Sequence, residues 1–218
     1  MDQDDKKNLV AEAALEYIKN GDILGIGSGS TVNKFINLLG SVRNKIEACV
    51  SSSNTSTELL KNMNIEVIDL KDAKSIPLYI DGADEANSQK ELIKGGGGAH
   101  TKEKVLASSS KCFICIADST KRVEQLGAFP LPIEVIPFAK DSVLHALGEY
   151  SENIIQRDFI TDSGNIILDL HGVDLRSPKE IETKLNLIPG VIDNGIFAHH
   201  VPRYIVVGNS EGYELIES

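Results

Sequence analysis

Apolar stretches alternate with amphipathic stretches along the first part of the chain. Residues 5–19 carry apolar side chains at helical spacing, and Gly21 is a helix stop signal. An apolar strand is predicted at residues 22–26, and a glycine–serine loop then leads into a helix that ends near residue 39. Strands that alternate with helices predict an α/β domain with a mostly parallel sheet and helices on both faces. The alternation continues through a helix-like segment at 55–62 and strand-like segments at 46–50, 65–68, 78–80 and 112–117.

The pattern changes near residue 129, where the segment FPLP (129–132) interrupts the alternation. An apolar strand at 204–208 can rejoin the first sheet. We therefore expect a larger, Rossmann-like α/β domain of residues 1–128 plus 204–218, and a smaller α+β domain of residues 129–203. The smaller domain's predicted strands lie at 133–137 and 165–170, and its predicted helices lie at 142–150 and 178–186.

Charge and composition narrow the classes of function. The formal charge is −10, so the chain lacks the broad basic surface that a nucleic-acid-binding protein needs. No uncharged apolar stretch approaches the ~20 residues that cross a bilayer, and the N-terminus has no signal-peptide pattern. An odd count of three cysteines favours reduced thiols. We expect a cytoplasmic enzyme that binds neither nucleic acids nor membranes.

A glycine-rich loop, GIGSGST at residues 25–31, follows the first predicted strand and opens a helix. Glycines let the backbone approach a ligand, and a helix N-terminus offers N–H groups and a favourable dipole to an anion. A dinucleotide-binding loop would need glycine at position 30, and a P-loop would need Gly-Lys before the Ser/Thr. The loop is therefore either a structural turn or a phosphate site, and its hydroxyl groups favour the phosphate.

Two carboxylates three residues apart, Asp81 and Asp84, follow the predicted strand at 78–80. Ligands of open α/β sheets bind beyond the carboxyl ends of the strands, which is where this loop belongs. The two carboxylates could hydrogen-bond hydroxyl groups, move protons or hold a divalent metal, although the spacing is not that of an EF-hand. A solvated turn is the remaining alternative, and direct substrate or proton chemistry is favoured.

Four consecutive glycines at residues 95–98 follow Lys94. Glycines cost backbone entropy, so a fold that retains four of them needs positive φ angles or a close approach to a ligand. Their N–H groups can form an anion-binding nest beside the charge of Lys94, and a flexible linker is the alternative. A helix beginning at His100 places Glu103 in its first turn, near this nest. On its own, Glu103 is most simply a favourable partner of the helix dipole.

Taken together, these blocks resemble the A type of ribose-5-phosphate isomerase. The order GSGST, DGADE, KGGGGA, Glu103 and DSTK (118–121) matches that family's blocks at near-identical spacing. The resemblance continues through residues 129–137, 162–165 and 188–191, so it spans nearly the whole chain. It implies an aldose–ketose isomerase that interconverts ribose 5-phosphate and ribulose 5-phosphate through an enediolate, with no metal and no organic cofactor.

The resemblance also implies roles for individual residues. Glu103 resembles the general base that moves a proton between C1 and C2. Asp81, Asp84 and Lys94 resemble the groups that hold the sugar oxygens and stabilise the intermediate. Ser30 and Thr31, with Lys7 and Lys121, resemble the phosphate-binding residues, which form part of a larger substrate-binding set. That implied set is Ser28, Gly29, Ser30, Thr31, Asp81, Gly82, Ala83, Asp84, Lys94, Gly95, Gly96, Gly97, Lys121 and Lys7.

The chain departs from the family pattern at a few positions. Ser28 stands where threonine is usual, which preserves the hydroxyl group. His100 replaces a common apolar residue, and Lys102 replaces a common arginine. His199 and His200 also differ from the usual residues. None of these changes touches the implied base.

Two other functions compete with the isomerase. A sugar-phosphate deaminase has a related α/β layout, although deamination calls for a different arrangement of bases after the glycine loop. A non-catalytic sugar-phosphate sensor usually carries a helix-turn-helix, for which the single predicted N-terminal helix leaves no room. We therefore expect an isomerase whose partner is a pentose 5-phosphate and which forms a homo-oligomer, with a dimer favoured.

Overall fold

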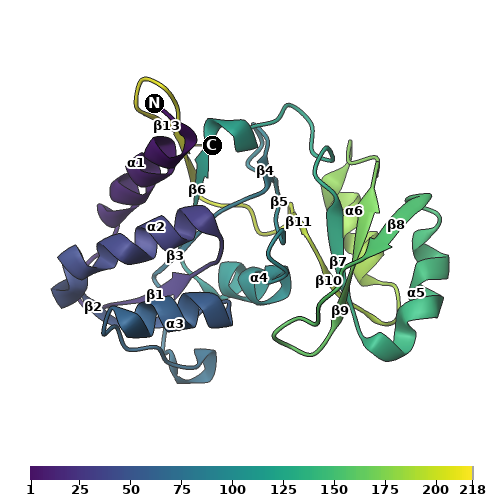
Figure 1. Cartoon of the computed structure of the whole chain (residues 1–218), viewed down its shortest axis with the longest axis horizontal. Helices are drawn as coiled ribbons and strands as arrows, with labels where there is room; N and C mark the ends of the chain where they lie inside the picture. Colours follow the sequence, from purple (N-terminus) through teal and green to yellow (C-terminus); the bar gives the residue numbers. More distant parts are fainter. Residues whose placement is uncertain (218) are drawn as a thin grey trace. The chain divides into compact units, whose positions relative to one another are not determined.

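The computed structural model describes residues 1–217, and the chain divides into two compact units (Figure 1). The first unit comprises residues 1–83, 102–122 and the stretch from residue 202 onward, and the second comprises residues 84–101 and 123–201. The sequence places 84–101 in the larger domain and the boundary at residue 129. These residues join the second unit because strand β5 (Leu92–Ile93) pairs there with strand β11 (Ile196–Phe197).

A six-stranded sheet forms the first unit's centre (Figure 1). Its order is β13-β12-β6-β3-β1-β2, in which five strands are parallel and the edge strand β13 is antiparallel to β12. Strand β12 pairs in parallel with β6, which confirms that residues 204–208 rejoin the first sheet. The strands are β1 (Asp22–Ile26), β2 (Ile46–Ser51), β3 (Leu78–Asp81), β6 (Phe113–Asp118), β12 (Tyr204–Gly208) and β13 (Tyr213–Ile216).

Side chains alternate across this sheet and so define its two faces. Leu24, Ile80 and Ile114 share one core cluster with residues of α1 and α2, so these helices cover that face. Tyr79 and Phe113 precede two of these residues and lie on the opposite face, where their ring centroids are 4.8 Å apart. The helices of this part of the chain are α1 (Gln3–Leu15), α2 (Ser30–Leu38), α3 (Asn54–Asn62) and α4 (His100–Ser109), with the 3-10 helices η1 (Leu39–Lys45), η2 (Leu70–Asp72) and η3 (Ser119–Lys121).

The second unit is built around an antiparallel sheet of order β10-β7-β9-β8. Ile133 and Leu168 of this sheet share a core cluster with Val143 of helix α5 and Leu185 of helix α6, so these helices pack on the sheet. A separate three-stranded antiparallel sheet has the order β11-β5-β4. The remaining elements are β4 (Glu85–Ala86), β7 (Leu131–Val135), β8 (Asn153–Gln156), β9 (Ile166–His171), β10 (Val191–Asn194), α5 (Lys140–Leu147), α6 (Pro178–Asn186) and the 3-10 helix η4 (Pro137–Ala139).

The structure differs from the predicted elements in a few places. The predicted strand at 65–68 is wrong, because this segment forms only an isolated parallel bridge between Val67 and Cys49. The first helix ends at Leu15, before the predicted end at residue 19. Strands β8, β10 and β13 and the two-residue strands were not predicted, since they are short and lack long apolar runs.

The predicted fold class is confirmed: the protein is α/β, with a mostly parallel central sheet and separate small antiparallel sheets. Within residues 1–217, no helix combines the length and the apolar character that a membrane crossing requires.

Candidate active site

Asp81 ends strand β3 and is the most enclosed of the predicted site residues in the first unit. Its side chain is fully buried, and Oδ1 accepts hydrogen bonds from the backbone N–H groups of Ser28 (3.1 Å) and Gly82 (2.7 Å). A Cβ atom at position 27 would lie 1.9 Å from the Asp81 carboxylate, so only glycine fits there. The glycine of the loop after β1 is therefore required by the carboxylate at the end of β3.

Tyr79 is a site residue that the sequence did not single out. Its hydroxyl donates a short hydrogen bond to Oδ2 of Asp81. Burial raises the pKa of Tyr79 well above its ordinary value, and the negative charges of Asp81 and Glu103 raise it further. The phenol therefore remains a donor to Asp81. The sequence does contain a feature that points to Tyr79. It lies two residues before Asp81 on the same strand, so both side chains point to the same face of the sheet.

Glu103 lies in the first turn of α4 and is almost completely buried, with 2% of its surface exposed. The hydroxyl of Ser28 donates a 2.6 Å hydrogen bond to Oε1 of Glu103, so the expectation that no departure from the family pattern touches the implied base is wrong for Ser28. The same serine donates its N–H to Asp81, so Ser28 joins the two carboxylates. Three residues predicted from separate motifs thus meet in the first unit. A buried carboxylate held by a hydroxyl group is suited to accept and return a proton.

The loop after β2 supports the loop after β1. The hydroxyl of Ser56, at the start of α3, donates a buried 2.7 Å hydrogen bond to the carbonyl oxygen of Gly27. Close by in the chain, the N–H of Ser52 donates to the carbonyl oxygen of Ile26. These two bonds hold the peptides that precede Ser28. Ser56 was not predicted, because nothing in its local sequence marks a partner 29 residues away.

The predicted phosphate residues come from three elements of the first unit. Helix α2 begins at Ser30 with no side-chain cap, whereas Asp2 caps α1 and Ser53 caps α3. Backbone N–H groups at such an end are suited to an anion. Gly29 has a φ of 97°, in the left-handed region that glycine tolerates, and Thr31 follows in the first turn of the helix.

The two predicted phosphate lysines lie on α1 and η3. Lys7 is half-buried on α1, and Lys121 ends η3 directly after strand β6. The neighbour of Lys7, Lys6, donates a 3.1 Å hydrogen bond from its Nζ to the hydroxyl of Ser119 in η3. This bond joins the two elements that carry the predicted lysines.

The remaining predicted residues lie in the second unit. The N–H of Gly96 donates a 2.7 Å hydrogen bond to Oδ2 of Asp84, and a Cβ at position 96 would come within 2.8 Å of that carboxylate. Gly95 and Gly98 have φ angles of 102° and 79°, so these two glycines supply the positive φ that the sequence predicted. Lys94 is buried, with its Nζ 5.5 Å from the ring centroid of Phe197.

A divalent metal was one alternative that the sequence left open for Asp81 and Asp84. Both Asp81 and Asp84 accept backbone N–H groups, which leaves fewer lone pairs for a cation. Within residues 1–217, no group of three or more His, Cys, Asp or Glu side chains is placed to hold a metal ion. The neighbouring Ala83, like Gly82, belongs to the loop that carries both aspartates.

Two of the histidines that depart from the family pattern, His100 and His199, contact other residues of the second unit. His100 is fully buried, with its Nε2 3.4 Å from the carbonyl oxygen of Asp193. His199 is exposed, with its Nε2 2.9 Å from the hydroxyl of Thr183.

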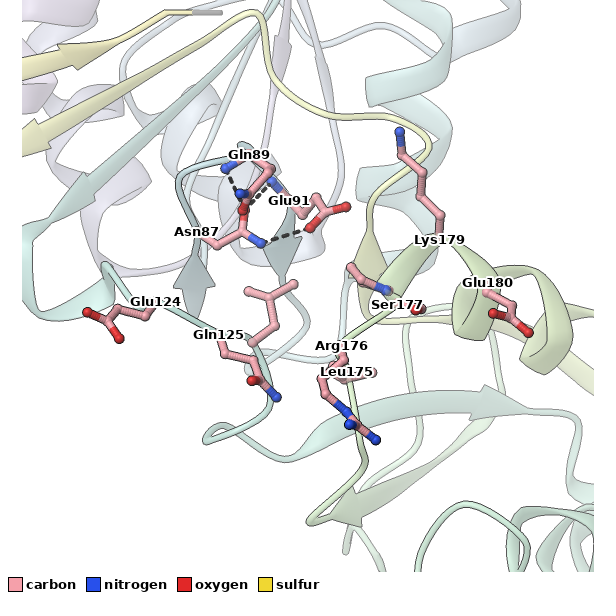
Figure 2. Close-up of a pocket in the computed structure, with 12 residues that line it drawn as sticks. Asn87, Gln89, Glu91, Glu124, Gln125, Leu175, Arg176, Ser177, Lys179 and Glu180 are labelled. Carbon is pink, nitrogen blue, oxygen red and sulfur yellow. Dashed lines mark hydrogen bonds between the residues drawn. The ribbon is translucent and has the colours of Figure 1, made fainter.

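The second unit also contains a cavity of about 540 Å³ (Figure 2). Its wall includes the carboxylates of Glu91, Glu124 and Glu180, together with Arg176 and Lys179. Arg176 is already paired with Asp174, so acidic groups dominate the lining. The cavity contains none of the predicted site residues, and its charge is unsuited to a phosphate.

Comparison with known proteins places these residues in context. The family model for ribose 5-phosphate isomerase A (phosphoriboisomerase A) matches residues 48–212 of the chain. The chain is 49% identical to ribose-5-phosphate isomerase A of Haemophilus influenzae (strain 86-028NP), and the alignment covers 100% of both proteins.

Solved structures are similar over the whole chain. Ribose 5-phosphate isomerase A of Neisseria gonorrhoeae superposes with a TM-score of 0.96 at 42% identity, covering 99% of this chain and 97% of that one. A D-ribose-5-phosphate isomerase in complex with phospho-erythronic acid gives a TM-score of 0.94 at 35% identity, covering 100% of both chains.

Proposed function

This chain belongs to the ribose 5-phosphate isomerase A family and interconverts D-ribose 5-phosphate and D-ribulose 5-phosphate, and we propose that Glu103 is the base that it uses. The observation that carries the proposal is the buried Glu103 carboxylate, which accepts a hydrogen bond from Ser28 beside Asp81. Isomerisation needs an open-chain sugar, a base for the C–H bond next to the carbonyl, and stabilisation of the enediolate. A buried carboxylate with a fixed orientation suits the second of these needs.

Proton transfer by Glu103 leaves the enzyme unchanged at the end of each turnover. In the aldose-to-ketose direction, the carboxylate takes the proton from C2, and the enediolate forms. The same carboxylate then returns the proton to C1, and a proton moves from the oxygen on C2 to the oxygen on C1. A positioned base of this kind contributes ~10²–10⁴-fold to the rate. Asp81 is the proposed group for the proton transfer between the oxygens, supported by its burial and its donor contacts.

Negative charge builds on the sugar oxygens as the proton leaves C2. We assign its stabilisation to the ammonium of Lys94 and the N–H groups of Gly95 and Gly97, following the family pattern, because the N–H of Gly96 already donates to Asp84. One preorganised donor of this kind is typically worth ~10²–10³-fold. Asp84 is the proposed partner of the sugar hydroxyls. A cation and backbone donors can together act as the electrophile, so this mechanism requires no metal.

The phosphate takes no part in the chemistry but provides binding energy that positions the reacting carbons. We propose that it binds at the N-terminus of α2, to Ser30 and Thr31, with Lys7 and Lys121. The uncapped start of α2 and the bond between Lys6 and η3 support this assignment.

We also propose that the enzyme is a cytoplasmic homodimer. No disulfide bond joins its three cysteines, all of which lie within residues 1–217, and this is typical of a reducing compartment. Large apolar side chains are exposed in the second unit, Phe138 at 99% and Leu187 at 76%, and such side chains are commonly covered by another subunit.

The direct test is an assay of purified protein on ribose 5-phosphate in excess EDTA, with the Glu103→Gln variant alongside. We expect the wild-type protein to form ribulose 5-phosphate, because the mechanism uses no metal. We expect kcat of Glu103→Gln to fall by ~10²–10⁴-fold while phospho-erythronic acid still binds, since the amide keeps the shape but cannot take the proton.

The matched control is Glu182→Gln. Glu182 and Glu103 have the same exposed fraction, 2%, but Glu182 accepts backbone N–H groups of residues 198 and 199 and has no proposed role in the reaction. Near-normal turnover by Glu103→Gln would remove the proposed base. Loss of wild-type activity in EDTA, restored by Mg²⁺, would favour the metal alternative for Asp81 and Asp84.

A further inference from the structure

Arg157 contacts the glycine loop of the second unit and belongs to none of the motifs that point to the isomerase. It directly follows strand β8, an edge strand of the four-stranded antiparallel sheet (Figure 1). Its Nη1 donates hydrogen bonds to the carbonyl oxygens of Gly95 (2.8 Å) and Gly96 (3.0 Å). One side chain therefore holds two consecutive peptides of the loop that follows Lys94.

The guanidinium is itself held on its other edge. Nε and Nη2 donate to the two carboxylate oxygens of Asp169, on strand β9, and both distances are 2.7 Å. The two side chains are largely buried, with exposed fractions of 13% for Arg157 and 16% for Asp169. Four bonds from one rigid plane fix the direction of each donor, which the single ammonium of a lysine cannot do.

The contacts determine which way the loop's N–H groups point. In a trans peptide the C=O and N–H bonds point in opposite directions. The peptide between Gly95 and Gly96 is held at both ends, its oxygen by Arg157 and its N–H by Asp84 at 2.7 Å. The oxygen of Gly96 is also held by Arg157, so the N–H of Gly97 is directed away from the guanidinium.

The neighbouring Phe159 encloses the end of the same loop. A Cβ at position 98 would lie 2.6 Å from the Phe159 ring, and the Arg157 guanidinium lies 6.0 Å from the centroid of that ring. Residues 157–159 thus contact the glycine loop from its first to its last residue.

We propose that Arg157, oriented by Asp169, is a positioning residue that holds the glycine loop so that its N–H groups are preorganised for the sugar oxygens. The inference rests on the proposed function, in which the N–H groups of Gly95 and Gly97 stabilise the enediolate. Donors aimed in advance at a developing charge need no reorganisation during the reaction, and this is the source of their effect. A guanidinium that fixes the peptide planes therefore acts on turnover without touching the substrate.

The test compares Arg157→Gln, Arg157→Lys and Asp169→Asn with the wild-type protein. For Arg157→Gln we expect kcat to fall by ~10–100-fold with a change in KM of less than about threefold, because the lost alignment affects mainly the transition state. We expect a similar fall in kcat for Arg157→Lys, since lysine keeps the charge but lacks the planar arrangement of donors. Asp169→Asn should lie between these variants and the wild type.

A second measurement tests the order of the loop itself, by amide hydrogen exchange of the peptide that covers residues 94–99. We expect exchange there to be at least ~10-fold faster in Arg157→Gln, with exchange in strand β6 unchanged. A general loss of folding would instead accelerate both segments. If Arg157→Gln is poorly folded, Asp169→Asn takes its place. This variant keeps the Arg157 side chain but loses the carboxylate that orients it, and exchange at residues 94–99 is again compared with exchange in strand β6.

The matched control is Arg176→Gln, in the same unit. Arg176 pairs with Asp174, its Nε bonding both carboxylate oxygens and its Nη2 bonding Oδ2, but the pair is exposed and has no recorded bond to the glycine loop. We expect this variant to keep wild-type turnover and wild-type exchange.

Two results would overturn the role of Arg157: turnover and exchange of Arg157→Gln that match the wild type, or full recovery of both in Arg157→Lys. If the wild type and the Arg176→Gln control both failed to convert ribose 5-phosphate, the proposed function would fail instead. The exchange measurement would then still decide whether Arg157 orders the loop.

Discussion

At the scale of single residues, the site of the first unit depends on Asp81. Its carboxylate accepts hydrogen bonds from the Tyr79 hydroxyl and from two backbone N–H groups, so both oxygens have fixed directions. A solvated turn would leave the carboxylate exposed, but here it is fully buried. The same burial explains why position 27 must be glycine.

We predict that Tyr79→Phe lowers thermal stability and kcat but does not change the shape of the pH–rate profile. Loss of one donor to a buried carboxylate costs about 1–3 kcal/mol. The raised pKa of Tyr79 keeps its hydroxyl protonated between about pH 6 and 9, so this group adds no titration there. Thermal melts and kcat measured across that range test the prediction. An alkaline limb that disappears in the variant would contradict it.

We predict that Lys94→Ala lowers kcat by ~10²–10³-fold with a smaller change in KM, because the ammonium is assigned to charge that exists mainly in the transition state. Steady-state kinetics on ribose 5-phosphate measure both constants. Lys179→Ala is the control, since Lys179 is exposed in the same unit and lines the acidic cavity. A rise in KM alone would make Lys94 a substrate-binding residue.

At the scale of elements, the first unit's predicted residues follow the carboxyl ends of neighbouring parallel strands. Ser28 follows β1, Asp81 ends β3 and Lys121 lies just after β6. Because β1, β3 and β6 are adjacent and parallel, their carboxyl ends share one edge of the sheet. Ser56 adds the loop after β2 to this edge through its bond to Gly27.

The 3-10 helix η3, which carries Lys121, is held by Asp118 at the end of β6. Oδ1 of Asp118 accepts the N–H of Thr120 at 2.9 Å, and Oδ2 accepts the side-chain amide of Gln3 at 3.3 Å. Burial acts to raise the pKa of Asp118, but the hydrogen bonds from Thr120 and Gln3 outweigh it and lower the pKa below its ordinary value.

We predict that Asp118→Asn lowers stability at pH 7 and weakens the loss of stability in acid. The pKa of the Asp118 carboxyl is lower in the folded protein than in the unfolded chain, where it is about 4. The carboxylate therefore stabilises the fold above about pH 4, and this contribution is lost as the pH falls through the folded-state pKa. Urea unfolding at several pH values measures it, with the exposed Asp72→Asn as control. Parallel pH dependences of wild type and Asp118→Asn would contradict the assignment.

At the scale of the whole molecule, the acidic charge of −10 leaves phosphate recognition to local groups. The groups proposed for this task are a helix N-terminus, a glycine loop and a few lysines. The second unit exposes the large apolar side chains of Phe138 and Leu187, and close to Phe138 in sequence a Cβ at position 190 would lie 2.3 Å from the Cβ of Ala139.

We predict a solution mass of about twice the 23.6 kDa of one chain, as expected for the proposed dimer. Phe138→Glu should shift the molecule toward the monomer, because burial of a charge in an apolar contact is costly. Light scattering coupled to size-exclusion chromatography measures both masses. A wild-type mass of one chain would rule out the dimer at that concentration, and an unaffected dimer in Phe138→Glu would place its interface elsewhere.

Much of the fold and part of the site were accessible from the amino-acid sequence. Apolar runs of three to six residues predicted β1, β2, β3 and β6, and the segment 178–186 was predicted with the bounds of α6. Ser28 and Asp81 were singled out because they lie in local motifs, whereas Glu103 was singled out only through the resemblance to the family. The segment 65–68 was mispredicted because its apolar residues allow a strand, but the fold provides only one bridge to Cys49.

Local sequence is sufficient for the alternation of strands and helices, the motifs and their order, since backbone propensity and side-chain period are local properties. Folding of the whole chain brings Ser28 between Asp81 and Glu103, places Tyr79 and Ser56 as their supports, and joins residues 84–101 to the second unit. The same holds for the contact of Arg157 with a loop 61 residues earlier in the chain. Such contacts join residues far apart in sequence, and packing of the whole chain, rather than any local pattern, selects them.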